Sequence, residues 1–97
     1  MIRGFRGAGT EDIFNGRATR AARKACPTSL WGVTVRKLEY LDSVARLQDL
    51  RVPPGNRLEV LVGNRRGQHS IRINDQYRIC FLWTDLGPDD VEIVDYH

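Results

Sequence analysis

The chain has 97 residues, of which 41% are hydrophobic and 28% charged, and a net charge of +3. This length suits one compact domain, residues 1–97, with a small core. No apolar run approaches the roughly 20 residues of a membrane-spanning helix, and the first ten residues lack the apolar stretch of a signal peptide. We therefore expect a cytoplasmic protein without a membrane partner.

Cysteine and histidine are sparse. Cys26, Cys80, His69 and His97 lie far from one another in the sequence. Their spacing fits neither a disulfide framework nor a zinc motif. We expect two buried, reduced thiols, and the sequence predicts no metal site and no cofactor.

Basic charge is concentrated in the first half of the chain. Residues 1–51 hold ten Lys and Arg against five Asp and Glu, whereas residues 52–97 hold five against seven. One run has no intervening acid and contains Arg17, Arg20, Arg23 and Lys24. Guanidinium groups suit bidentate contact with phosphate. On charge alone, this run is equally an RNA-binding segment or an ordinary solvated surface.

The first part of the chain predicts a short strand and a short helix. Residues 2–5 fit an opening strand. Thr10 is a favoured helix N-cap residue and Gly16 a favoured stop, which indicates a helix of about two turns between them. We interpret the alanine-rich, basic residues 17–27 as a loop with some helical character.

A longer amphipathic helix follows the cap residues Thr28 and Ser29. Apolar or small side chains recur every three or four residues, at Leu30, Thr34, Leu38, Leu41 and Ala45. This period is typical of a helix with one face in the core. The proline-rich residues 52–56 end this region.

From there on the apolar period shortens from about 3.6 residues to 2, as in strands. Four alternating segments are separated by short turns, at residues 57–62, 68–73, 76–83 and 91–97. Short turns between successive strands make an antiparallel meander. The predicted fold is therefore α+β, with a sheet of about four meandering strands plus the N-terminal strand, packed on two N-terminal helices.

The alternation also assigns side chains to the two faces of the sheet. Ile79 and Phe81 share the face expected to meet the helices, whereas Arg78 lies on the other face. Arg72, on the preceding strand, should share the face of Arg78. We expect both arginines to stand on an open face of the sheet.

The ordered stretch "RLEVLVGNRRGQHSIRINDQYRICF", followed by "VDYH", resembles the HigB-type (plasmid maintenance killer) toxins, a branch of the RelE-like superfamily. The opening "MIRGF", the "IFNG" helix end and "PPGNRL" fit the same family, so the resemblance covers essentially the whole chain. It implies the RelE-like fold and a toxin of a type II toxin–antitoxin system that cleaves messenger RNA on the ribosome. The implied partners are a helix-turn-helix antitoxin of the HigA type, the ribosome and messenger RNA, with operator DNA bound only through the antitoxin complex.

The resemblance also implies site residues. The catalytic ones are Arg78, Asp95, Tyr96 and His97. Metal-free RNA cleavage by the 2′-hydroxyl needs a base, a cation for the phosphate and an acid for the leaving oxygen. His97 suits acid or base, Tyr96 can donate a proton or stack on a base, and Asp95 can orient a partner. The residues expected to bind RNA are Arg17, Arg20, Arg23, Lys24, Arg65, Arg66 and Arg72.

Three alternatives remain open. In the first, the last strand is plain sheet without a catalytic role, and Arg78 is paired to an Asp. The chain also departs from the family, which commonly has a His and a Lys where this sequence has Glu59 and Val62. Because Glu59 cannot neutralise phosphate, we expect a weak nuclease, or a catalytically reduced RNA- or ribosome-binding protein that acts by occupancy and is neutralised by an antitoxin. A third possibility is a partner whose main role is co-repression with a DNA-binding antitoxin.

Overall fold

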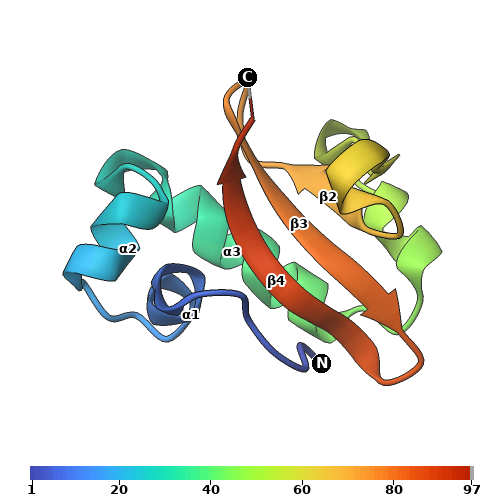
Figure 1. The fold of residues 1–97 in the computed structure, drawn as a ribbon, viewed down its shortest axis with the longest axis horizontal. Helices are drawn as coiled ribbons and strands as arrows, with labels where there is room; N and C mark the ends of the chain where they lie inside the picture. The colour runs from blue at the N-terminus through green and yellow to red at the C-terminus, as the bar shows by residue number, and fades with distance from the viewer. Residues whose placement is uncertain (97) are drawn as a thin grey trace.

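The computed structural model describes residues 1–96, in which three α-helices pack on a four-stranded antiparallel sheet (Figure 1). The helices are α1 (Ala8–Phe14), α2 (Arg20–Ala25) and α3 (Trp31–Ser43), and the strands are β1 (Glu59–Val60), β2 (His69–Arg72), β3 (Tyr77–Thr84) and β4 (Gly87–Asp95). Four 3₁₀ turns complete the chain: η1 (Thr28–Leu30), η2 (Leu47–Arg51), η3 (Pro54–Asn56) and η4 (Gly63–Arg65). The strand order β1-β2-β3-β4 confirms the predicted meander and the α+β class.

The core lies between α3 and the sheet, as the two periodicities predict. In Figure 1, α3 passes behind β3 and β4. Its residues Thr34, Leu38 and Leu41 are buried, and the two leucines join a cluster with Ile79 and Phe81 of β3. The expected helix-facing side of the sheet is therefore correct.

The N-terminal helices differ from the prediction in two ways. Thr10 does not cap α1; it is buried inside the helix, and its hydroxyl accepts the backbone N–H of Ile93 at 3.0 Å. Residues expected to form a loop with some helical character contain the regular helix α2, which is capped by Thr19. The two helices approach so closely that a Cβ on Gly9 would lie 2.5 Å from the carbonyl oxygen of Ala21. Tertiary packing thus stabilises a helix that is too short to form by itself.

The sheet edges also differ from the prediction. The expected N-terminal strand is reduced to one parallel bridge between Phe5 and Val91, with hydrogen bonds that cover the β4 edge. β1 is shorter than the expected segment because Arg57 and Gly63, on either side of it, have left-handed backbone conformations. β4 begins earlier than expected because the chain reverses tightly between Thr84 and Gly87.

No helix in the part of the chain that the structure describes combines the length and the apolar character needed to cross a membrane.

Candidate active site

Arg78 lies near the start of β3, and its guanidinium is held in place. The residue is only 7% exposed. Its Nε donates to the hydroxyl oxygen of Ser70 at 2.7 Å, and its Nη2 donates to the carbonyl oxygen of Arg57 at 2.6 Å. A buried guanidinium must have its donors satisfied, because otherwise its loss of water is not compensated. The cation therefore has one well-defined position.

The expectation of an open face around Arg78 is only half right. Arg72 pairs with Arg78 in the ladder, so both share one face as predicted. That face, however, is covered around Arg78 and Cys80, which are both buried. Part of the cover comes from Arg65 of η4, whose guanidinium lies 3.1 Å from the carboxylate of Glu92 on β4. Because β2 and β3 lie between β1 and β4, this ion pair reaches across the face over Cys80, the ladder partner of Glu92.

Both cysteines, Cys26 and Cys80, are buried free thiols, as predicted. Burial is the main cause that raises the pKa of each. A neutral thiol is a poor nucleophile, so neither cysteine suits covalent chemistry.

Glu59 of β1 supplies an acid beside Arg78. Its carboxylate oxygen lies 3.7 Å from Arg78 Nη2, and its side chain is 51% exposed. One alternative from the sequence was that Arg78 pairs with an Asp. Its partner is instead Glu59, the glutamate that departs from the family pattern. A carboxylate thus lies beside the cation that a phosphate would approach.

The end of β4 lies beside the start of β3. Asp95 is the ladder partner of Tyr77, one position beyond the pair of Arg78 and Val94. Gln76 binds both neighbouring residues: its side-chain amide donates to Asp95 at 3.2 Å, and its carbonyl oxygen accepts the Tyr96 N–H at 2.6 Å. Strand alternation continued to Tyr96, which is 42% exposed, puts its ring on the face of Arg78, whereas Asp95, the partner of Tyr77, lies on the other face. His97 lies outside the described residues.

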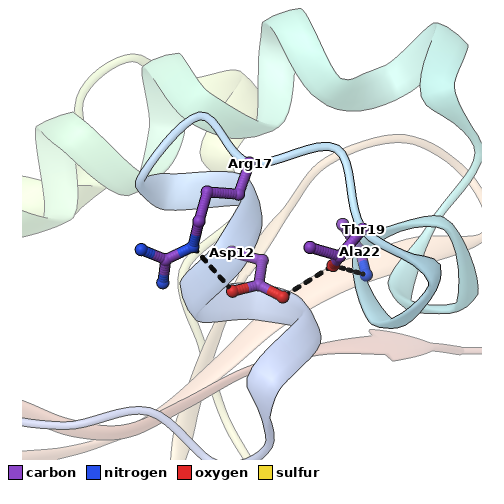
Figure 2. A network of polar contacts seen from close by, with 4 residues as sticks. All are labelled: Asp12, Arg17, Thr19 and Ala22. Carbon is purple, nitrogen blue, oxygen red and sulfur yellow. Dashed lines mark hydrogen bonds and ion pairs between the residues drawn. The ribbon is translucent and has the colours of Figure 1, made fainter.

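The basic run of residues 17–24 contains no acid, but the fold places the carboxylate of Asp12 beside it. The Nε of Arg17 lies 3.1 Å from the carboxylate of Asp12, and the same carboxylate accepts a hydrogen bond from the Thr19 hydroxyl (Figure 2). That bond is the main cause that lowers the pKa of Asp12. Thr19 in turn accepts the N–H of Ala22 and so caps α2. The positive charge of Arg17 is therefore partly neutralised by Asp12 within the chain.

The other predicted RNA-binding residues fall into two groups. Arg20, Lys24 and Arg66 are exposed. The others bind groups of the chain: Arg23, also exposed, donates to the carbonyl oxygen of Ala18, Arg65 pairs with Glu92, and Arg72 pairs with Asp75.

The structure separates the basic residues of α2 from Arg72 and Arg78. Lys24 of α2 lines a shallow cavity together with Glu92 and Ile93 of β4. In Figure 1, α2 and β2 lie on opposite sides of β4. The α2 residues therefore form a second basic surface rather than an extension of the Arg78 site.

Sequence reasoning missed the residues that hold Arg78 in place. Alternation already put Ser70 on the face of Arg78, which was the available signal. The sequence could not indicate the carbonyl oxygen of Arg57 as an acceptor, because every residue carries a backbone carbonyl. Within residues 1–96, no group of three or more His, Cys, Asp and Glu side chains could hold a metal ion.

Comparisons with known proteins identify the family of the chain. A family model described as the RelE-like toxin of type II toxin–antitoxin system HigB matches residues 5–97. The Toxin HigB-1 of Vibrio cholerae serotype O1 is 52% identical over 59 residues, which are 61% of this chain and 62% of that toxin. An uncharacterized protein of Haemophilus influenzae is 40% identical over 57 residues, 59% of this chain and 56% of that protein. The matched stretches thus span less than two thirds of either relative.

Proposed function

Because the chain belongs to the HigB-like family of RelE-like toxins of type II toxin–antitoxin systems, we propose that it is a ribosome-dependent messenger RNA endonuclease. The observation that carries this proposal is the position of Arg78. Its buried guanidinium is fixed by Ser70 and Arg57, next to the strand end that bears Asp95 and Tyr96. A preorganised cation on the face of a group that can transfer protons, here the Tyr96 hydroxyl, is what phosphate chemistry requires.

The proposed reaction is metal-independent. The 2′-oxygen of one nucleotide bonds to its own 3′-phosphorus, and the bond from that phosphorus to the 5′-oxygen of the next nucleotide breaks. A base takes the proton of the 2′-hydroxyl, and an acid gives a proton to the departing 5′-oxygen. The products are a 2′,3′-cyclic phosphate and a 5′-hydroxyl.

Each site residue has a role in this proposal. Arg78 neutralises the charge that develops on the phosphate; its Nε and Nη2 are bonded to protein oxygens, so we assign Nη1 to the phosphate. His97 acts as the acid or the base, since imidazole titrates near neutral pH. Tyr96 donates a proton or stacks on a base, and Asp95 orients the imidazole or a substrate hydroxyl.

A second candidate function is ribosome binding with reduced catalysis. The position of Glu59 favours it, because a carboxylate 3.7 Å from Arg78 Nη2 repels an incoming phosphate. Toxicity would then depend on occupancy of the ribosome rather than on cleavage. Val62, an exposed aliphatic residue in place of a basic one, adds to the loss of positive charge.

The partners in this proposal follow from the family. We propose a helix-turn-helix antitoxin of the HigA type that neutralises the chain, operator DNA bound only through that complex, and action on ribosomes in the cytoplasm. Co-purification of the chain with the product of a neighbouring reading frame tests the antitoxin, and a chain that emerges alone under mild conditions contradicts it.

The deciding experiment is primer-extension mapping of messenger RNA after induction of the chain. The wild type is expected to give ribosome-dependent cuts that persist in chelator, apart from effects of chelator on the ribosome itself. Both His97→Ala and Asp95→Asn should lose the cuts. Asp85→Asn is the matched control, because Asp85 is an exposed acid in the turn at the other end of β3 and β4.

If the wild type and His97→Ala both inhibit growth without cutting messenger RNA, the endonuclease proposal is wrong and ribosome occupancy is the better explanation.

A further inference from the structure

Lys37 of α3 reaches the bend formed by η3 (Pro54–Asn56) and the next residue, Arg57. Its ammonium donates to the side-chain oxygen of Asn56 at 2.6 Å. Asn56 is only 2% exposed, and its amide nitrogen donates to the carbonyl oxygens of Leu50 and Val52 at 3.3 and 3.4 Å. These two bonds orient the amide, so that its oxygen faces Lys37. The lysine is therefore held in place from both ends, by its helix and by a buried amide.

The same bend holds Arg78. Lys37 binds the side chain of Asn56, and Arg78 binds the carbonyl oxygen of the next residue, Arg57. The two cations are therefore anchored on consecutive residues, whose Cα atoms are about 3.8 Å apart. They come from α3 and β3, which are distant in sequence.

A third cation, Arg72, is the ladder partner of Arg78 and lies on the same face of the sheet. Burial, and then the positive charges of Arg72 and Arg78, lower the pKa of Lys37. The two arginines are therefore close enough for their charges to act on the lysine.

The carboxylates near this cluster neutralise only part of its charge. Glu59 pairs only with Arg78, and Asp75, which is 99% exposed, pairs with Arg72. Within residues 1–96, no carboxylate lies within ion-pair distance of Lys37. Three cations with two carboxylates keep an excess of positive charge, and a bound polyanion relieves the remaining repulsion between them.

We propose that Lys37, positioned by Asn56, binds a phosphodiester of the RNA beside Arg78 and Arg72. This inference rests on the proposed function and adds to it a binding residue from α3. A bound phosphate accepts from the lysine ammonium while the arginine forks contact the same anion or the next one along the strand. The alternative is that Lys37 only fastens α3 to the bend.

The test measures binding separately from cleavage. Ribosomes are programmed with a message whose A-site codon carries 2′-O-methyl groups, which cannot attack the phosphate, and the affinity of the chain is measured at several salt concentrations. Lys37→Gln keeps a hydrogen-bond donor for Asn56 but removes the charge. We expect its affinity to fall about tenfold, and the slope of log affinity against log salt to decrease by about 0.7 to 0.9.

The matched control is Arg36→Gln. Arg36 is the exposed neighbour of Lys37 on α3, so the same charge is lost from the same helix. Its affinity should stay within about twofold of the wild type, since screening weakens exposed distant charges. Lys37→Arg should keep most of the affinity. Equal losses in Lys37→Gln and Arg36→Gln, or no loss in Lys37→Gln, would overturn the proposal.

A second measurement needs no variant. The titration of Lys37 in the wild type is followed by NMR of its side-chain carbon, with and without a 2′-O-methylated RNA hexamer. Binding should raise the pKa of Lys37, because a nearby phosphate favours the ammonium form. If the pKa of Lys37 is unchanged at saturating hexamer, Lys37 does not bind phosphate and only fastens α3 to the bend.

The outcomes separate the two proposals. If the wild type does not cut an unmodified message but its binding still depends on Lys37, the endonuclease function fails and the phosphate site stands. If the wild type cuts and Lys37→Gln binds equally well, the phosphate site fails and the function stands. A wild type that does not bind programmed ribosomes would overturn both.

Discussion

The carboxylate of Glu59 lies 3.7 Å from the guanidinium of Arg78, although β2 separates the strands that carry them. The contact is possible because the ladders align Glu59 with Ser70, and Ser70 in turn accepts a hydrogen bond from Arg78. The side chains of three neighbouring strands thus meet on one face. An acid at this point sets the charge that an approaching phosphate meets.

Replacing Glu59 by Gln should therefore strengthen RNA binding. An exposed ion pair contributes about 0.2 to 1 kcal/mol, so we expect a gain in ribosome affinity of up to about fivefold. The melting temperature should change little. Glu39→Gln is the control, because Glu39 is an exposed acid on α3 and its loss changes the net charge equally. The same gain in both variants would show an effect of net charge only.

Removing the side chain of Arg78 should cost stability as well as activity. Arg78→Ala leaves Ser70 and the carbonyl oxygen of Arg57 without a buried partner, which predicts a loss of about 2 to 4 kcal/mol in the free energy of unfolding. Arg72→Ala should lose less than about 1 kcal/mol, because its partner Asp75 is exposed. Urea denaturation measures both values. Similar values for the two variants would contradict the role assigned to the buried bonds.

Stability should depend on pH through His69. Burial lowers the pKa of His69 below its usual 6.5, and its Nδ1 is buried without a hydrogen-bond partner among the described residues. Between the folded pKa and about 6.5 the unfolded chain binds more protons, so stability rises with pH in that window and falls as pH drops below about 6.5. Melting temperatures of wild type and His69→Gln between about pH 7.5 and 5 test this. We expect a smaller acid loss in the variant, and parallel curves would rule the histidine out.

The basic residues of α2 and Arg17 before it should not contribute equally to ribosome binding. All four are exposed, but Arg17 and Arg23 also bind groups of the chain itself. A double change of Arg20 and Lys24 to Gln should weaken association and flatten its salt dependence more than a double change of Arg17 and Arg23. Sedimentation with ribosomes measures both. Unchanged association in both double variants would remove α2 from the proposed binding surface.

Deleting His97 should abolish growth inhibition and leave the fold intact. The ladder between β3 and β4 reaches Tyr96 through Gln76, so the deletion leaves those hydrogen bonds in place. Tyr96→Phe should be mild if the ring only stacks and severe if its hydroxyl donates a proton. Growth assays and melting curves give the two readouts. Full toxicity of the variant without His97 would favour ribosome occupancy over cleavage. Unfolding of this variant would mean that the end of the chain has a structural role.

Much of the fold was predictable, because periodicity is a local property of the sequence. The stripe of Thr34, Leu38 and Leu41 predicted the face of α3 that enters the core. Alternation put Ile79 and Phe81 in the core, and Arg72 beside Arg78. The family was predictable from the ordered motifs. The roles of Asp95, Tyr96 and His97 remain predictions.

The tertiary structure alone decided which groups meet across long stretches of chain. It buried Arg78, brought Glu59 to it across β2, paired Arg17 with Asp12, and led Lys37 to Asn56. Neither local propensity nor charge counts contain these contacts. Two of them follow from burial, because Arg78 and Asn56 are almost fully covered in the folded chain. Each must then find a partner from whichever segment the fold brings near, since a buried donor or charge without one costs several kcal/mol.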